Sequence, residues 1–137
     1  MVKVIMGVKG SGKTKQMVDT INAAVAEETG SVVCIEKGSK LVYDIKYSVR
    51  LIEASDYPIG GYSYLKGFIS GLHAGNYDIT HFFIDNFYKL VEDKSDAEVV
   101  SFVKWLDAYS NREQIDFTIS MTADRDNCPE ELRKFLD

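Results

Sequence analysis

The residues of this chain best suited to chemistry begin with the octapeptide Gly7 to Thr14, which fits the pattern G-x-x-x-x-G-K-[ST]. Its glycines let the backbone turn so that successive N–H groups face one anion, while Lys13 adds a positive charge and Thr14 a hydroxyl. These groups hold phosphate oxygens and Mg²⁺, so the octapeptide predicts binding of a nucleoside triphosphate. The residues expected to contact the nucleotide are Gly7, Val8, Lys9, Gly10, Ser11, Gly12, Lys13, Thr14 and Lys15.

A carboxylate at the end of a second apolar segment would complete a metal site. The segment 79–84 reads Ile-Thr-His-Phe-Phe-Ile and is followed by Asp85. In nucleotide-binding proteins that carry a phosphate loop, an aspartate in this position helps to hold Mg²⁺. We therefore expect Thr14 and Asp85 to be the metal ligands. The competing interpretation is an aspartate that only caps the turn after the strand.

Three further residues follow apolar segments and are candidates for catalysis. Glu36 follows the segment 31–35 and would polarise an attacking water, unless it is an ordinary solvated residue at a strand end. Thr122 follows the segment 115–121 and would hydrogen-bond the γ-phosphate or the water, unless it only ends the strand. Arg125 would stabilise charge in the transition state. The expected catalytic set is Glu36, Lys13, Thr122 and Arg125.

An alternation of strands and helices must position these side chains. Apolar runs predict strands at 2–6, 31–35, 49–53, 79–84 and 115–121, and helical spacing predicts helices between them. Ser95 to Glu98 has the pattern of a capping box, Gly67 and Gly71 are expected to allow close packing against a sheet, and a short helix is expected to run through Leu136. The order predicts a single domain, residues 1–137, with a three-layer α/β fold: a mainly parallel sheet with helices on both faces.

Composition limits the classes of function. The formal net charge of −5 gives no overall basic surface, so nucleic acid is an unlikely partner. Cys34 and Cys128 lie far apart without flanking histidines, which argues against a zinc site and a disulfide framework. The sequence shows no signal peptide and no apolar stretch near the roughly 18 residues of a membrane span. We therefore expect a cytoplasmic protein that does not enter a membrane.

The first 36 residues resemble the core of the PilT-like secretion and pilus-retraction ATPases. That resemblance rests on the phosphate loop, the helix after it, and the strand Val33-Cys34-Ile35-Glu36. It implies that Glu36, which stands at the acidic box of that family, polarises water or helps to place Mg²⁺. Short ATP-binding proteins of Gram-positive bacteria look like this chain from end to end, and some carry a twitching-motility label.

The element order across the whole chain also resembles the type II thymidine kinases, whose core is RecA-like. Their metal-binding segment matches Asp85-Asn86-Phe87-Tyr88, and the loop after their last core strand matches 122–125. The catalytic glutamate of that family corresponds here to Asn86, whose amide cannot act as a general base at neutral pH. The resemblance implies a RecA-like P-loop fold and leaves the reaction open.

Three functions remain. The first is a Mg²⁺-dependent ATP-binding protein with slow ATPase activity that works as a small switch or subunit, with ATP favoured over GTP because no N-K-x-D sequence occurs. The second is a kinase for a nucleoside-like molecule. The third is a nucleotide-gated interaction module that does not hydrolyse its nucleotide. An excess of aromatic residues predicts a surface for a protein partner, homo-oligomers included, at Tyr57, Tyr62, Tyr64, Phe87 and Tyr88.

Overall fold

The computed structural model describes residues 1–137 and contains one five-stranded sheet in which every strand pair is parallel. The strand order is β1-β5-β4-β2-β3, so β5 lies between the first strand and β4. The strands are β1 (Val2–Gly7), β2 (Ser31–Glu36), β3 (Arg50–Glu53), β4 (Ile79–Ile84) and β5 (Asp116–Thr122). All five expected strands are present within two residues of their expected ends, and the fold is the predicted α/β class.

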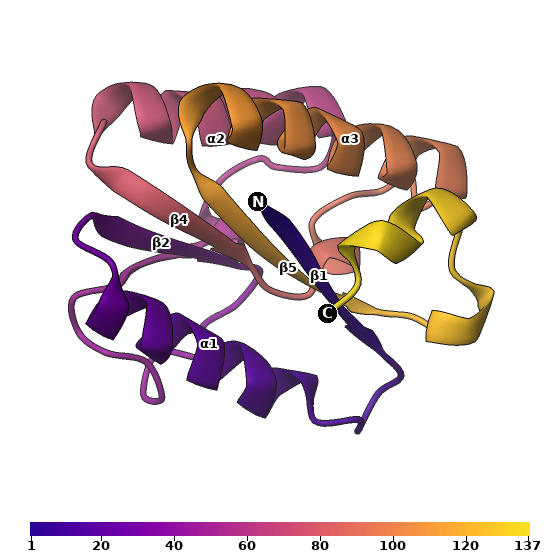
Figure 1. Ribbon diagram of the computed structural model, residues 1–137, viewed down its shortest axis with the longest axis horizontal. Coiled ribbons are helices and arrows are strands. Elements are labelled where there is room, and N and C mark those ends of the chain that lie inside the picture. The colour runs from indigo at the N-terminus through magenta and orange to yellow at the C-terminus, as the bar shows by residue number, and fades with distance from the viewer.

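Helices cover both faces of the sheet and make three layers (Figure 1). Helix α1 (Lys13–Glu27) covers one face, and helices α2 (Tyr62–Gly75) and α3 (Asp96–Glu113) lie side by side on the other. Two helical side chains join α2 to α3, because His73 Nδ1 and Tyr109 Oη are hydrogen-bonded at 2.8 Å. No helix is long and apolar enough to span a membrane.

Alternate residues of the buried strands supply two separate cores. On the α1 side, Ile5 and Phe83 pack with Met17 and Ile21. On the other side, Phe82 and Phe117 stack with their ring centroids 5.3 Å apart beneath α2 and α3. Side chains of successive strand residues point to opposite faces, so a strand buried on both faces must be apolar almost throughout. This is why the strands could be recognised as continuous apolar runs.

The end of the chain returns to the free edge of β1. Leu136 forms a parallel bridge with Val4, and the N–H of Asp137 donates to the carbonyl of Val4 at 2.9 Å. The expected short helix before it is a 3₁₀ helix, Glu130–Phe135, which ends one residue before Leu136. Its buried residues Leu132 and Phe135 pack into the core beside α3.

Two expectations about the helices are wrong. Ser95 is the N-cap residue of α3, but its side chain makes no capping hydrogen bond, so the capping box does not form. Asp93 Oδ1 instead accepts the N–H of Ser95 at 2.9 Å. Gly67 and Gly71 do not pack closely against the sheet. Both are exposed, and a Cβ added at Gly67 or at Gly71 would meet no atom within 4 Å.

Candidate functional site

The octapeptide forms the loop between β1 and α1. Gly10 and Gly12 have backbone φ values of 84° and 90°, which residues other than glycine rarely adopt. Gly12 is the N-cap residue of α1, and no side chain caps the first turn of that helix. The unpaired N–H groups at a helix N-terminus, together with the positive end of the helix dipole, favour an anion at this position.

Lys13 bends back over the same loop. Its Nζ donates to the carbonyl of Val8 at 3.0 Å, and its side chain is only partly buried. This exposed contact is weak compared with a charge-assisted hydrogen bond to a phosphate oxygen. The ammonium group can therefore exchange the carbonyl for an anion held by the loop.

Asp85 faces this loop from the end of β4 and is held by Ser120. Asp85 is 5% exposed, and its Oδ1 accepts the Ser120 hydroxyl at 2.8 Å. Ser120 Oγ also accepts the N–H of Asn86 at 2.8 Å, and Thr122 Oγ1 donates to Asn86 Oδ1 at 3.3 Å. Because β5 lies between β1 and β4, its hydroxyls bridge the space between the phosphate loop and the carboxylate.

These groups line one cavity of about 600 Å³ at the carboxyl ends of the strands, where ligands bind in open α/β sheets. Asp85 is the only carboxylate in its wall, whereas four lysines reach it from three different segments. In a chain with a net charge of −5, this is a local concentration of positive charge. The lining residues are Lys9, Gly10, Gly12, Lys13, Thr14, Lys40, Asp85, Asn86, Tyr88, Lys89, Ser120 and Thr122.

The structure therefore brings together most of the residues singled out from the sequence. Lys9, Lys13 and Thr14 lie in the same cavity wall as Asp85 and Thr122. Gly7, Val8 and Ser11 belong to the loop but do not line the cavity. Lys15 points away from it and pairs with Asp19 at 2.8 Å.

Glu36 and Arg125 do not line this cavity. Glu36 is buried at the end of β2, where its Oε1 accepts the N–H of Lys40 at 2.7 Å and its Oε2 the N–H of Leu41 at 3.2 Å. Arg125 lies beyond β5, and its Nη1 donates to the carbonyl of Met6 at 3.3 Å. Both side chains hold backbone segments beside the site.

Five lining residues were not among the expected site residues: Lys40, Asn86, Tyr88, Lys89 and Ser120. Lys40 belongs to the irregular segment after β2, whose course has no periodic signal. Tyr88 and Lys89 lie in a short 3₁₀ helix, Phe87–Lys89, directly after Asp85. Ser120 could have been found, because a polar residue inside the apolar run 115–121, two residues before Thr122, must place its hydroxyl among buried neighbours.

The expected aromatic surface is present only in part. Phe87 is fully buried in the core, and Tyr62 and Tyr88 are half-buried. Tyr57 and Tyr64 are exposed as predicted. The more exposed aromatic side chains are three tyrosines that the sequence analysis did not single out, Tyr43, Tyr47 and Tyr77.

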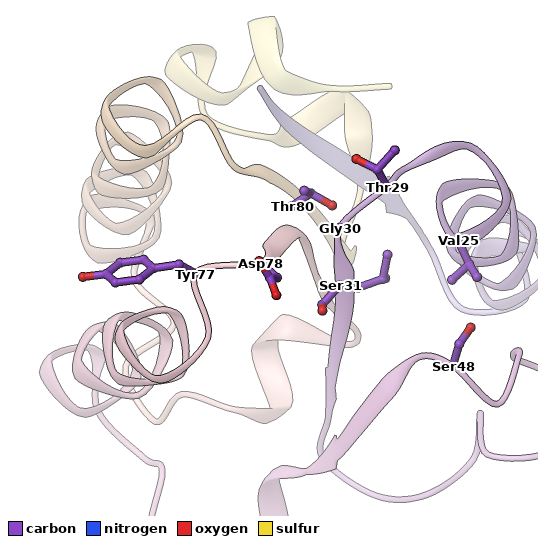
Figure 2. A pocket seen from close by; sticks show the side chains of 9 residues that line it. Val25, Thr29, Gly30, Ser31, Ser48, Tyr77, Asp78 and Thr80 are labelled. Carbon is purple, nitrogen blue, oxygen red and sulfur yellow. The ribbon is translucent and has the colours of Figure 1, made fainter.

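A second cavity, of about 690 Å³, lies at the opposite end of the sheet (Figure 2). The hydroxyl-bearing side chains of Thr29, Ser31 and Thr80 gather around Gly30, and Tyr77 extends away from them. No lysine, arginine or histidine lines this cavity, and Asp78 adds a negative charge. Although this cavity is the larger of the two, it has no positive charge to bind an anion. The lysine-lined cavity at the carboxyl ends of the strands therefore remains the candidate site.

The fold is similar to that of a known protein. The crystal structure of the flagellar accessory protein FlaH from Methanocaldococcus jannaschii matches with a TM-score of 0.56 at 13% sequence identity. The match covers 97% of this chain and 65% of the FlaH chain, so the chain spans less than two thirds of FlaH. No protein-family model and no curated protein matches the sequence. The similarity shows a RecA-like three-layer α/β fold. The sequence resemblances to PilT-like ATPases and thymidine kinases rest on motifs and element order alone.

Proposed function

We propose that this chain binds ATP with Mg²⁺ in the lysine-lined cavity and hydrolyses it slowly. One observation carries the proposal: Lys13 and Thr14 of the glycine loop share a cavity wall with Asp85, and three more lysines line the same space. A triphosphate brings several negative charges, and four ammonium groups with a helix N-terminus can compensate them.

Each residue has a physical role in this proposal. The loop N–H groups hold the phosphates, and Lys13 leaves the Val8 carbonyl to reach the β- and γ-phosphates. Thr14 and Asp85 offer a hydroxyl and a carboxylate, the hard oxygen donors that fit Mg²⁺, which is commonly held by one or two protein groups together with phosphates and water. Bound there, Mg²⁺ would neutralise charge on the phosphates.

The same cavity supports slow rather than fast hydrolysis. Asp85 is the only carboxylate in the wall and would be engaged as a metal ligand. The neighbouring Asn86 cannot take a proton from water at neutral pH. Thr122, which lines the cavity, remains to orient the attacking water through its hydroxyl. A site without a free base, relying on orientation and charge, is expected to turn over slowly.

Replacing Lys13 tests nucleotide binding directly. Lys13→Ala should weaken ATP affinity on the order of a hundredfold, because it removes charge-assisted hydrogen bonds to phosphate. Isothermal titration with Mg²⁺ and ATP provides the measurement. Lys15→Ala is the matched control, since Lys15 lies two residues further along the same helix and pairs with Asp19 outside the cavity. Equal affinity in the Lys13 variant and the parent protein would end the proposal.

Turnover then separates the remaining functions. Release of phosphate from ATP and water alone supports the ATPase. Release of ADP only in the presence of a nucleoside-like acceptor supports a kinase. Binding without any turnover supports an interaction module, a role that the exposed Tyr57 and Tyr64 would serve. GTP should bind more weakly than ATP in the same titrations.

A further inference from the structure

The buried carboxylate of Glu36 organises the segment that follows β2. Glu36 is 3% exposed, and each of its two oxygens accepts a backbone N–H from this segment. Hydrogen bonds between a carboxylate and N–H groups are among the stronger ones in proteins. A carboxylate that is bonded in this way and closed off from solvent is placed to fix the backbone.

The segment is tied down on both sides of Lys40. The carbonyl of Lys37 accepts the N–H of Ser55 at 3.1 Å. On the other side, Leu41 is 1% exposed and packs in the core beneath α1. Lys40 lies between these anchors with its N–H bonded to Glu36, so its backbone is fixed while its side chain stays exposed.

Lys40 lines the candidate cavity together with residues of the phosphate loop. Strand β2 pairs with β4, and the N–H of Asp85 donates to the carbonyl of Ile35 at 2.9 Å. The segment after β2 therefore leaves the sheet beside Asp85, with β5 and β4 lying between β2 and β1. Lys13 and Lys40 thus approach the same space from different segments.

We propose that Lys40 binds the terminal phosphate of the bound triphosphate, and that Glu36 is the positioning residue that holds Lys40 there. The inference rests on the proposed function and deepens it. A cation that reaches the γ-phosphate distinguishes ATP from ADP, because ADP lacks that group. It also gives the charge stabilisation in hydrolysis that an arginine from a second subunit supplies in other nucleotide hydrolases.

In the reaction, the oxygen of water forms a bond to the γ-phosphorus while the bond to the β–γ bridging oxygen breaks. The electron pair of the broken bond stays on the oxygen of ADP, and a water proton passes to a phosphate oxygen. Negative charge on the transferred group is spread over its outer oxygens during this step. Lys40 would stabilise that charge from the side facing β2.

Binding of two nucleotides tests the assignment of Lys40. In isothermal titration with Mg²⁺, Lys40→Ala should weaken the affinity for the non-hydrolysable analogue AMP-PNP about tenfold, with the affinity for ADP changed less than twofold. Lys40→Arg should restore most of the difference. Lys37→Ala is the matched control, because it removes the same charge from the same segment at a residue that does not line the cavity.

A double-mutant cycle tests the role of Glu36. Glu36→Gln should reduce the preference for AMP-PNP over ADP, and adding it to Lys40→Ala should reduce that preference no further, because both changes act through the same contact. Thermal unfolding shows whether each variant is folded. A purely structural role of Glu36 would lower the melting temperature without changing the preference.

The two proposals fail in different ways. If the parent protein binds neither nucleotide, the proposed function fails. If the parent binds both and Lys40→Ala weakens both equally or neither, only the assignment of Lys40 is overturned. If Glu36→Gln abolishes turnover at an unchanged AMP-PNP preference, Glu36 acts on water and the positioning role is overturned.

Discussion

The Ser120 hydroxyl donates to Asp85 Oδ1 at 2.8 Å and at the same time accepts the N–H of Asn86. One buried side chain of β5 thus fixes both the carboxylate that follows β4 and the direction in which the chain leaves that strand. Asn86 has a φ of 50°, a left-handed conformation that only a few residue types adopt readily. The bond from Ser120 helps to hold it there.

Replacing Ser120 should therefore destabilise the fold locally. Ser120→Ala leaves one oxygen of Asp85 and the N–H of Asn86 without their partner, at an expected cost of about 1–3 kcal/mol in the free energy of unfolding. Urea denaturation provides the measurement. Ser101→Ala, at an exposed position of α3, should change stability by no more than about 0.5 kcal/mol. Equal effects of the two changes would contradict the importance of the bond.

Asp85 should make nucleotide binding depend on metal. Asp85→Asn keeps an oxygen for the Ser120 hydroxyl but removes the negative charge. We expect the gain in ATP affinity on adding Mg²⁺ to be lost, while affinity measured in EDTA is kept or improved because a charge that repels phosphate is gone. Asp78→Asn, at the cavity on the opposite end of the sheet, is the control. An undiminished Mg²⁺ effect in the Asp85 variant would exclude it as a ligand.

The sequence was sufficient to place the residues that stand in local patterns. The phosphate loop follows a continuous apolar strand, and Asp85 follows another, so both could be placed at one edge of a parallel sheet. Lys40 and Glu36 could not be interpreted in the same way. Their relationship depends on an irregular turn that brings the N–H groups of residues 40 and 41 back to the carboxylate. No periodicity in the sequence reports such a turn.

The helical glycines show a second limit of sequence reasoning. A glycine in a helix indicates either close packing or an open surface, and only the neighbours of its missing Cβ distinguish the two. Gly30 is the opposite of Gly67 and Gly71: a Cβ there would lie 2.1 Å from Thr80 Cγ2 and 2.4 Å from the Asp78 carbonyl. The place of Gly30 in the sequence, after the last residue of α1, does not indicate that Thr80 and Asp78 lie this close to it.

These surroundings predict opposite effects of alanine. Gly67→Ala and Gly71→Ala should each raise the free energy of unfolding by about 0.5–1 kcal/mol, since alanine has the higher helix propensity and there is space for its methyl group. Gly30→Ala should lower it, because the backbone carbonyl of Asp78 must move. Thermal and urea unfolding give the comparison. Destabilisation by either α2 substitution would show that the exposed glycine face is covered in the protein in solution.

The two cysteines should differ sharply in reactivity. Cys34 is fully buried in β2, and burial, followed by the nearby charges of Asp85 and Glu36, raises the pKa of its thiol well above the ordinary value. Cys128 is partly exposed. Because the thiolate is the reactive form, iodoacetamide at pH 8 should modify Cys128 alone.

Mass spectrometry of the intact protein then gives one added group per chain. The Cys128→Ser variant should stay unmodified until it is unfolded in urea, when Cys34 becomes accessible and its pKa returns toward the ordinary range. The raised pKa also sets the sign of the pH effect: unfolding releases the Cys34 proton above about pH 9, so stability should fall as the pH rises beyond that value. Rapid modification of Cys34 in the folded variant would show that β2 and the segment held by Glu36 open readily, and would contradict the rigid placement of Lys40.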